Sequence, residues 1–147
     1  MIHHHIHHLK TAGNCDVHDI TSVVETVIAE SKIQNGIVTV FFIGSTGGIT
    51  TIEFEPGLKS DIKKLFQSMI PYNKEYAHHK TWGDDNGSSH LQSALLKTSL
   101  VVPLINSAAV LGRWQQIVVI DFDTRPRNRE IVIQVMGELQ LSSFLSG

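Results

Sequence analysis

The chain has one cysteine, Cys15, among its 147 residues. A lone thiol forms no intramolecular disulfide, which excludes the small secreted proteins that disulfides stabilise. No apolar run reaches the roughly 18 residues of a membrane-spanning helix, and no hydrophobic signal segment precedes the first predicted elements. We therefore expect a protein of the cytoplasm without a membrane partner. Cys15 lies in a polar stretch without a catalytic pattern, so we do not expect it to act as a nucleophile.

An excess of charge of either sign is also absent. Lys and Arg total 12 and Asp and Glu total 14, so the formal net charge is −2. A chain without a strong positive field is poorly suited to binding nucleic acid through its phosphates, and we expect no such partner. Its 41% apolar and 18% charged residues are typical of a globular domain. The whole chain, residues 1–147, is long enough for a single domain with its own core.

Histidine is abundant at the start of the chain, where five of the first eight residues are histidine. Residues 1–5 have the composition of an expression tag or a flexible end. The segment 6–11 also fits a first β-strand, and we favour the strand. Clustered histidines bind nickel or zinc in either case, so such binding would not indicate a catalytic site.

Hydrophobic periodicity predicts two main helices, over residues 19–34 and 61–70, and a shorter one over 90–96. Asn35-Gly36 is expected to end the first helix, and Glu55-Pro56-Gly57 to end a strand. Strands are predicted over 37–43, 49–54, 99–105, 115–121 and 130–137, the first two joined as a hairpin or bulge by the glycine-rich segment 44–48. Residues 139–147 are expected to form a tail of uncertain order. Short connections between the late strands favour a compact α+β domain with largely antiparallel sheets.

The long polar segment 72–89 and the residue that follows it are the strongest candidate for a functional site. His78, His90 and Asp84 are of the types that hold zinc or magnesium. His78, His90 and Asp85 are equally suited to exchanging protons, and Asn86 to binding a substrate. The alternative is a solvated loop in which Asn86-Gly87 forms a turn and Ser88 or Ser89 caps the next helix.

Three further groups of residues suggest binding chemistry. Ser45 and Thr46, in the glycine-rich segment 44–48, present hydroxyl and amide groups that suit a phosphate, although the same segment is also a plausible tight strand connection. Glu53 at a strand end is a second candidate for proton transfer, or an ordinary solvent-facing residue. Trp114 and Gln115 are candidates to line a pocket. Arg125 is a candidate either to bind phosphate or to form an ion pair. Arg127 and Arg129 are expected to pair with nearby aspartates or with a neighbouring subunit.

Several separated motifs, in order, resemble the YjbQ-like family, most closely its archaeal-type branch. They are HDIT at 18–21, NGIVTVF at 35–41, GST at 44–46, TIE at 51–53, YAH at 76–78 with Trp82, DNGSSHL at 85–91, SLVVP at 99–103, LGRWQQI at 111–117 and DFDTRPR at 121–127. The resemblance covers nearly the whole chain. It implies a compact α+β fold with antiparallel sheets, usually assembled as a homotrimer.

The resemblance also implies an activity, secondary thiamine-phosphate synthase, which joins a pyrimidine diphosphate to a thiazole phosphate. Such a reaction calls for a divalent cation and a small phosphorylated metabolite. The chain departs from the family pattern at Gly44 and Ser88, where many members carry histidine. Two hypotheses follow: an enzyme acting through the residues named above, or a non-catalytic module of the same fold that binds a ligand or assembles.

Overall fold

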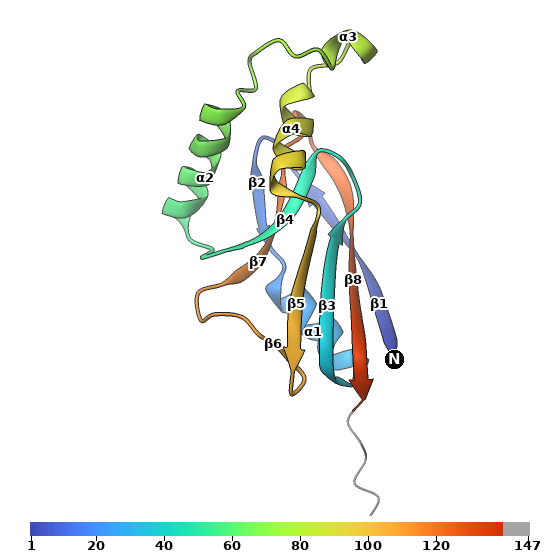
Figure 1. Ribbon diagram of the computed structural model, residues 1–147. Helices are drawn as coiled ribbons and strands as arrows, with labels where there is room; N and C mark the ends of the chain where they lie inside the picture. Colours follow the sequence, from blue (N-terminus) through green and yellow to red (C-terminus); the bar gives the residue numbers. More distant parts are fainter. Residues whose placement is uncertain (140–147) are drawn as a thin grey trace, which may run out of the picture.

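The computed structural model describes residues 1–139 and contains two antiparallel sheets (Figure 1). The larger sheet has five strands in the order β1-β8-β3-β5-β6, and the smaller has three in the order β2-β7-β4. Their bounds are β1 Ile2–Thr11, β8 Arg127–Leu139, β3 Ile33–Phe42, β5 Ser99–Ile105 and β6 Ala108–Ala109, then β2 Asp16–Asp19, β7 Gln116–Asp121 and β4 Gly47–Ile52. The predicted α+β class with antiparallel sheets is confirmed.

Four helices accompany the sheets: α1 Thr21–Ser31, α2 Pro56–Met69, α3 His79–Trp82 and α4 Gly87–Leu96. Helix α1 packs on one face of the five-stranded sheet through Val24, Val27 and Ile28. Helix α2 covers the three-stranded sheet, where Phe66 meets Phe122 with ring centroids 4.7 Å apart. Figure 1 shows α2 at one side of the molecule and α3 at the end of the long connection that leads to α4.

Strand β7 is buried on both faces because it lies between two hydrophobic clusters. Ile117 and Val119 join the main core against α1 and the five-stranded sheet. Val118 and Ile120 face the other way, into the smaller cluster under α2. Alternate side chains of a strand point to opposite faces, so a strand covered on both sides needs a continuous apolar run, and the IVVI sequence of β7 supplies it.

Helix α2 begins five residues earlier than predicted, at Pro56. The Glu55-Pro56-Gly57 sequence was expected to end a strand, but it starts the helix. The Glu55 carboxylate accepts hydrogen bonds from the backbone N–H groups of Gly57, at 2.8 Å, and of Leu58. Backbone N–H groups in the first turn of a helix have no partner within the helix. Proline fits there because it has no N–H group. The first turn is therefore stabilised by capping. The helix start was missed because Glu55-Pro56-Gly57 also has the composition of a turn.

Asn35-Gly36 was expected to end the first helix, and this prediction is wrong. Helix α1 ends at Ser31, followed by Lys32 in the left-handed conformation with φ +58°. Gly36 lies within β3, opposite Gly137 of β8. A Cβ on Gly36 would lie 2.0 Å from the Met136 carbonyl oxygen, so the glycine permits a close approach of two strands.

The predicted hairpin between residues 37–43 and 49–54 is also wrong, because β3 and β4 lie in different sheets. Segment 44–46 carries the chain from the larger sheet to the smaller. The strand predicted over 6–11 is confirmed and extends back to Ile2, so residues 2–5, considered as a tag, pair with β8. Of the predicted tail 139–147, residues 140–147 lie outside the described residues. Within residues 1–139, no helix is long and apolar enough to cross a membrane.

Candidate functional site

Helix α4 and the crossover between the sheets form a pocket of about 300 Å³, here called the Lys97 pocket. The side chains from α4 and its end lie three or four residues apart, which places them on one helical face. The lining residues are Gly44, Ser45, His90, Ser93, Ala94, Lys97 and Thr98. Of these, Ser45 and His90 were predicted site residues. Lys97 was not, because a single lysine at a helix end carries no recognisable pattern.

A second pocket, of about 430 Å³, is here called the Asp84 pocket. The segment between α3 and α4 forms one wall, and the turn after β7 forms the other. The lining residues are Gly83, Asp84, Asp85, Asn86, Thr124 and Arg125. Four predicted site residues, Asp84, Asp85, Asn86 and Arg125, are thus brought together, as the hypothesis of a functional loop requires.

His78 and His90 connect the two pockets. Their rings are 4.3 Å apart between centroids and tilted by 51°. His78 Nε2 lies 3.3 Å from Asp84 Oδ2, close enough for an ion pair but not aligned as a hydrogen bond. A contiguous chain of side chains therefore runs from Asp84 through His78 to His90, which lines the Lys97 pocket.

Burial lowers the pKa of His90 below its ordinary value of 6.5, and the neighbouring His78 lowers it further. Asp123 and Asp84 act in the opposite direction without cancelling these two effects. A histidine with a lowered pKa is neutral at pH 7. His90 is therefore a proton acceptor in the free protein.

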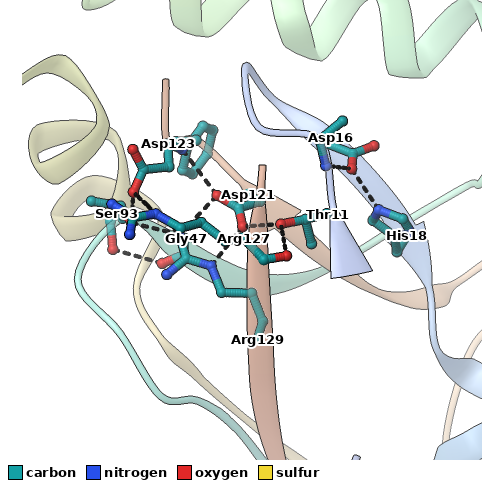
Figure 2. A network of polar contacts seen from close by, with 12 residues as sticks. Thr11, Asp16, His18, Gly47, Ser93, Asp121, Asp123, Arg127 and Arg129 are labelled. Carbon is teal, nitrogen blue, oxygen red and sulfur yellow. Dashed lines mark hydrogen bonds and ion pairs between the residues drawn. The ribbon is translucent and has the colours of Figure 1, made fainter. Parts of the chain in front are cut away.

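A buried network of aspartates and arginines supports the crossover (Figure 2). Arg129 Nε lies 2.6 Å from Asp121 Oδ2, and Arg127 Nε lies 2.9 Å from Asp123 Oδ2. The predicted pairing of both arginines with nearby aspartates is confirmed. Thr46 donates to Asp123 Oδ2 at 3.0 Å and accepts from Arg129 Nη2 at 2.6 Å. Thr46 is therefore buried within the network, and of the two predicted hydroxyls only Ser45 lines a pocket.

Asp123, which sequence reasoning did not select, connects a residue of the Asp84 pocket with Thr46, the buried neighbour of Ser45. Its carboxylate accepts from Thr46, next to the Lys97 pocket, and from the Thr124 backbone N–H at 2.7 Å. The Thr124 hydroxyl then donates to Asp85 Oδ1 at 2.9 Å. Burial raises the pKa of Asp123, but hydrogen bonds from Thr124, Thr46 and Arg127 lower it overall. Asp123 is therefore a fixed anion that holds Thr124 of the Asp84 pocket and Thr46 beside the Lys97 pocket.

The start of α4 is held by histidine instead of by a serine cap. The Gly87 N–H donates to His79 Nε2 at 3.0 Å, which requires that nitrogen to be unprotonated. Ser88 and Ser89 lie inside the helix and are fully buried. Within residues 1–139 their hydroxyl oxygens, like the Asn86 amide oxygen, have no hydrogen-bond partner. The alternative in which Ser88 or Ser89 caps this helix is therefore wrong.

Three predicted site residues lie away from both pockets, at the opposite end of the smaller sheet. The β4–β7 ladder pairs Gly47 with Asp121 at the site end and Ile52 with Gln116 at the other. These ends are about 17 Å apart at the usual rise of a strand. The residues concerned are Glu53, which is exposed, Trp114, which is 61% exposed, and Gln115, whose amide donates to Thr51.

The side chains predicted to hold a metal are neighbours, but they do not form a complete ion site. Among the residues that the structure describes, no three His, Cys, Asp or Glu side chains are placed to share one ion. His78 and His90 meet ring against ring, and Asp84 contacts only His78 of the two. Zinc or magnesium at this position stays a prediction, and no chemical step is assigned to it.

Fold and site together define a single α+β domain with a polar site where two antiparallel sheets meet. The family model described as "UPF0047 protein YjbQ-like" matches residues 5–138, and the chain belongs to this family. A UPF0047 protein of Methanothermobacter thermautotrophicus is 40% identical over 130 residues, 88% of this chain and 89% of the relative. One of Archaeoglobus fulgidus is 36% identical over 128 residues, 87% of this chain and 97% of the relative.

Solved structures agree with this assignment. A YbjQ-like protein of unknown function from Sulfolobus solfataricus matches with a TM-score of 0.89 and 30% identity, over 94% of this chain and 99% of the other. An uncharacterised YjbQ/UPF0047 family protein from Clostridium acetobutylicum gives a TM-score of 0.82 and 28% identity, over 90% of this chain and 99% of the other.

The activity expected from the resemblance is wrong. The family model and the relatives named above identify an uncharacterised family, and none of them carries thiamine-phosphate synthase as its activity. Thiamine-phosphate synthase is a different fold and family. The joining of a pyrimidine diphosphate to a thiazole phosphate is therefore withdrawn.

Proposed function

We propose that this protein binds a small phosphate monoester in the Lys97 pocket and that His90 exchanges a proton with it. The observation that supports this is that three residues of unlike chemistry line one pocket: Lys97, Ser45 and His90. A cation, a hydroxyl and a neutral imidazole together satisfy the charge and the hydrogen-bonding oxygens of a phosphate. The pocket volume of about 300 Å³ suits a small molecule.

The charge of Lys97 is available to a ligand. No carboxylate of residues 1–139 forms an ion pair with it. The two buried aspartates of the neighbouring network, Asp121 and Asp123, are already paired with Arg129 and Arg127. A dianion entering the pocket therefore meets an exposed cation at its wall that no carboxylate of residues 1–139 neutralises.

His90 gives the pocket its proton chemistry. Its pKa is lowered in the free protein by burial and by His78. A bound phosphate dianion stabilises the imidazolium and raises this pKa, so binding takes up a proton. In the free state His90 is a neutral proton acceptor, and in the bound state it donates a hydrogen bond to the phosphate.

Replacement of Lys97 by Gln tests this proposal. The variant is expected to bind ethyl phosphate about tenfold more weakly than the unmodified protein, equivalent to about 1.4 kcal/mol, because a charge-assisted hydrogen bond is lost. Isothermal titration calorimetry measures the affinity. Lys64→Gln, an exposed position on α2, is the matched control and should leave the affinity unchanged. Equal affinities in both variants, or no binding in any protein, would show that this pocket is not a phosphate site.

We also propose that the protein assembles as a homotrimer, which the family resemblance implies. The face of the five-stranded sheet turned away from α1 supports this, since it exposes large apolar side chains that a partner would cover. They are Ile2, Ile6, Phe41, Val101, Ile105 and Met136. Native mass spectrometry should give three times the chain mass, and Val101→Glu should give mainly single chains, because a charge cannot enter an apolar interface unpaired. Lys63→Glu on α2 is the control, and a single-chain mass for the unmodified protein would exclude the trimer.

A further inference from the structure

Strand β1 is an open edge of the five-stranded sheet. It pairs with β8 on one side and with no strand of residues 1–139 on the other (Figure 1). Edge strands are commonly protected from pairing with other chains by a proline, a bulge or several lysines. Residues 2–11 contain no proline, keep an unbroken register with β8 and include one lysine, Lys10. The edge is therefore free to accept a further strand.

The hydrogen bonds at the start of the chain show which backbone groups face this open edge. The Met1 nitrogen donates to the Gly137 carbonyl oxygen at 3.0 Å, and the Gly137 N–H donates to the Met1 carbonyl oxygen at 3.1 Å. In an antiparallel ladder, residues bonded in this way alternate with residues that form no bond to that neighbour. The odd-numbered residues of β1 therefore bond to β8. The backbone N–H and C=O groups of the even-numbered residues, from Ile2 to Lys10, point to the open edge.

A second copy of β1 is complementary to this edge when it runs antiparallel with Ile6 opposite the partner's Ile6. The even-numbered residues of both strands then provide the hydrogen bonds between the copies. His5 lies opposite the partner's His7, and His7 opposite the partner's His5. Both are non-hydrogen-bonded pairs, in which the Cα atoms are about 4.5 Å apart and the side chains are closest. Four histidines thus meet on one face of the joined strands.

Two histidines of one chain supply half of a zinc site. His5 is exposed and His7 partly exposed, and both lie on the same face of β1 as Leu9, which packs on the main core. Within residues 1–139 of one chain, no three His, Cys, Asp or Glu side chains can share an ion. Structural zinc takes four ligands, and imidazole is one of its usual ligands. A second copy of the strand supplies the two that are missing.

We infer that zinc binds between two copies of β1, held by His5 and His7 of each copy, and joins the two larger sheets into one continuous sheet. The site is assigned to assembly and not to catalysis. It involves neither the Lys97 pocket nor the face of the sheet that exposes Ile2 and Ile6, because His5 and His7 point to the opposite face. Its test is therefore independent of the phosphate site and of the trimer.

The experiment adds Zn²⁺ to the metal-free full chain and follows the mass of the assembly by native mass spectrometry. The mass should at least double, with about one bound zinc per two chains by elemental analysis, and EDTA should restore the zinc-free mass. The double variant His5→Gln, His7→Gln should lose the mass increase and bind zinc at least tenfold more weakly. The matched control His4→Gln, His8→Gln removes two histidines from the other face of the same strand and should keep both properties.

Adventitious chelation by a histidine-rich segment gives a different result. Zinc would then bind without a change of mass, and the two double variants would lose affinity equally, which would overturn the inference. No zinc binding, or a mass increase that persists in His5→Gln, His7→Gln, would overturn it as well. Imidazole ¹⁵N chemical shifts provide the same test without a substitution. In the unmodified protein, zinc should shift the signals of His5 and His7 and leave those of His4 and His8 in place, and the reverse pattern would contradict the site.

Discussion

Replacing Asp121 by Ala is expected to lower the free energy of unfolding by about 3–5 kcal/mol, because the buried Arg129 loses its bidentate partner and keeps only the longer ion pair with Asp123, at 3.6 Å. The Asp121 side chain is fully buried, and that of Arg129 is 10% exposed. Arg129 donates to both carboxylate oxygens of Asp121, at 2.6 Å from Nε and 2.9 Å from Nη2. Thr11 and the backbone N–H of Asp123 donate to the same carboxylate. Urea denaturation followed by circular dichroism measures the loss.

Two further variants show whether the unpaired charge is the cause. Asp61→Ala, an exposed position on α2, should change the stability by no more than about 0.5 kcal/mol. The double variant Asp121→Ala, Arg129→Met removes both charges and should be more stable than Asp121→Ala alone, since no buried arginine is left without its bidentate partner. A loss below about 1 kcal/mol for Asp121→Ala would mean that water reaches Arg129 and that the network contributes little.

Gly36→Ala is expected to cost about 3 kcal/mol of stability, because the added methyl group has no room between two strands. Its Cβ would lie 2.0 Å from the Met136 carbonyl oxygen and 2.7 Å from the Gly137 Cα. Backbone atoms of a paired strand cannot rotate away, so β3 and β8 would have to separate locally. These strands form the centre of the five-stranded sheet together with β5. Thermal and urea denaturation measure the effect.

The matched control for this substitution is Gly112→Ala. A Cβ at Gly112 would meet only the Gln115 side chain, at 3.6 Å, an ordinary van der Waals distance. This variant should stay within about 1 kcal/mol of the unmodified protein. Equal stability of Gly36→Ala and Gly112→Ala would contradict the close approach of β3 and β8 at this point.

The sequence predicted the elements whose pattern is local. The apolar run of β7 and the periodicity of the second half of α2 both identified their structures. The start of α2 was missed because Glu55-Pro56-Gly57 also has the composition of a turn, and only the position of the Glu55 carboxylate distinguishes the two. Asn35-Gly36 was misread for a related reason. Glycine serves in turns and in close strand contacts alike, and the sequence does not show which.

Proximity of the candidate residues was predicted where they lie close in the sequence, as His78, Asp84 and His90 do. Proximity was not predicted where the pairing of strands determines which residues become neighbours. Glu53 and Trp114 were placed near the site, but the antiparallel β4–β7 ladder puts them at the opposite end of the sheet. Lys97 and Asp123 escaped selection because their importance comes from contacts across 50 or more positions, such as Thr46 with Asp123, 77 residues apart. No local pattern encodes such a contact.

The pairing of β1 with β8 has a consequence for the order of events during synthesis. Ile2 pairs with Met136 and Thr11 with Arg127. Almost all of residues 1–139 must therefore be synthesised before β1 can pair with β8. Until β8 leaves the ribosome, the five histidines of β1 lie on a strand without a neighbour, free to pair with other chains or to bind metal ions. Such a long-range contact also slows folding. Residues 2–11 of a nascent chain therefore stay without their strand partner until synthesis is almost complete.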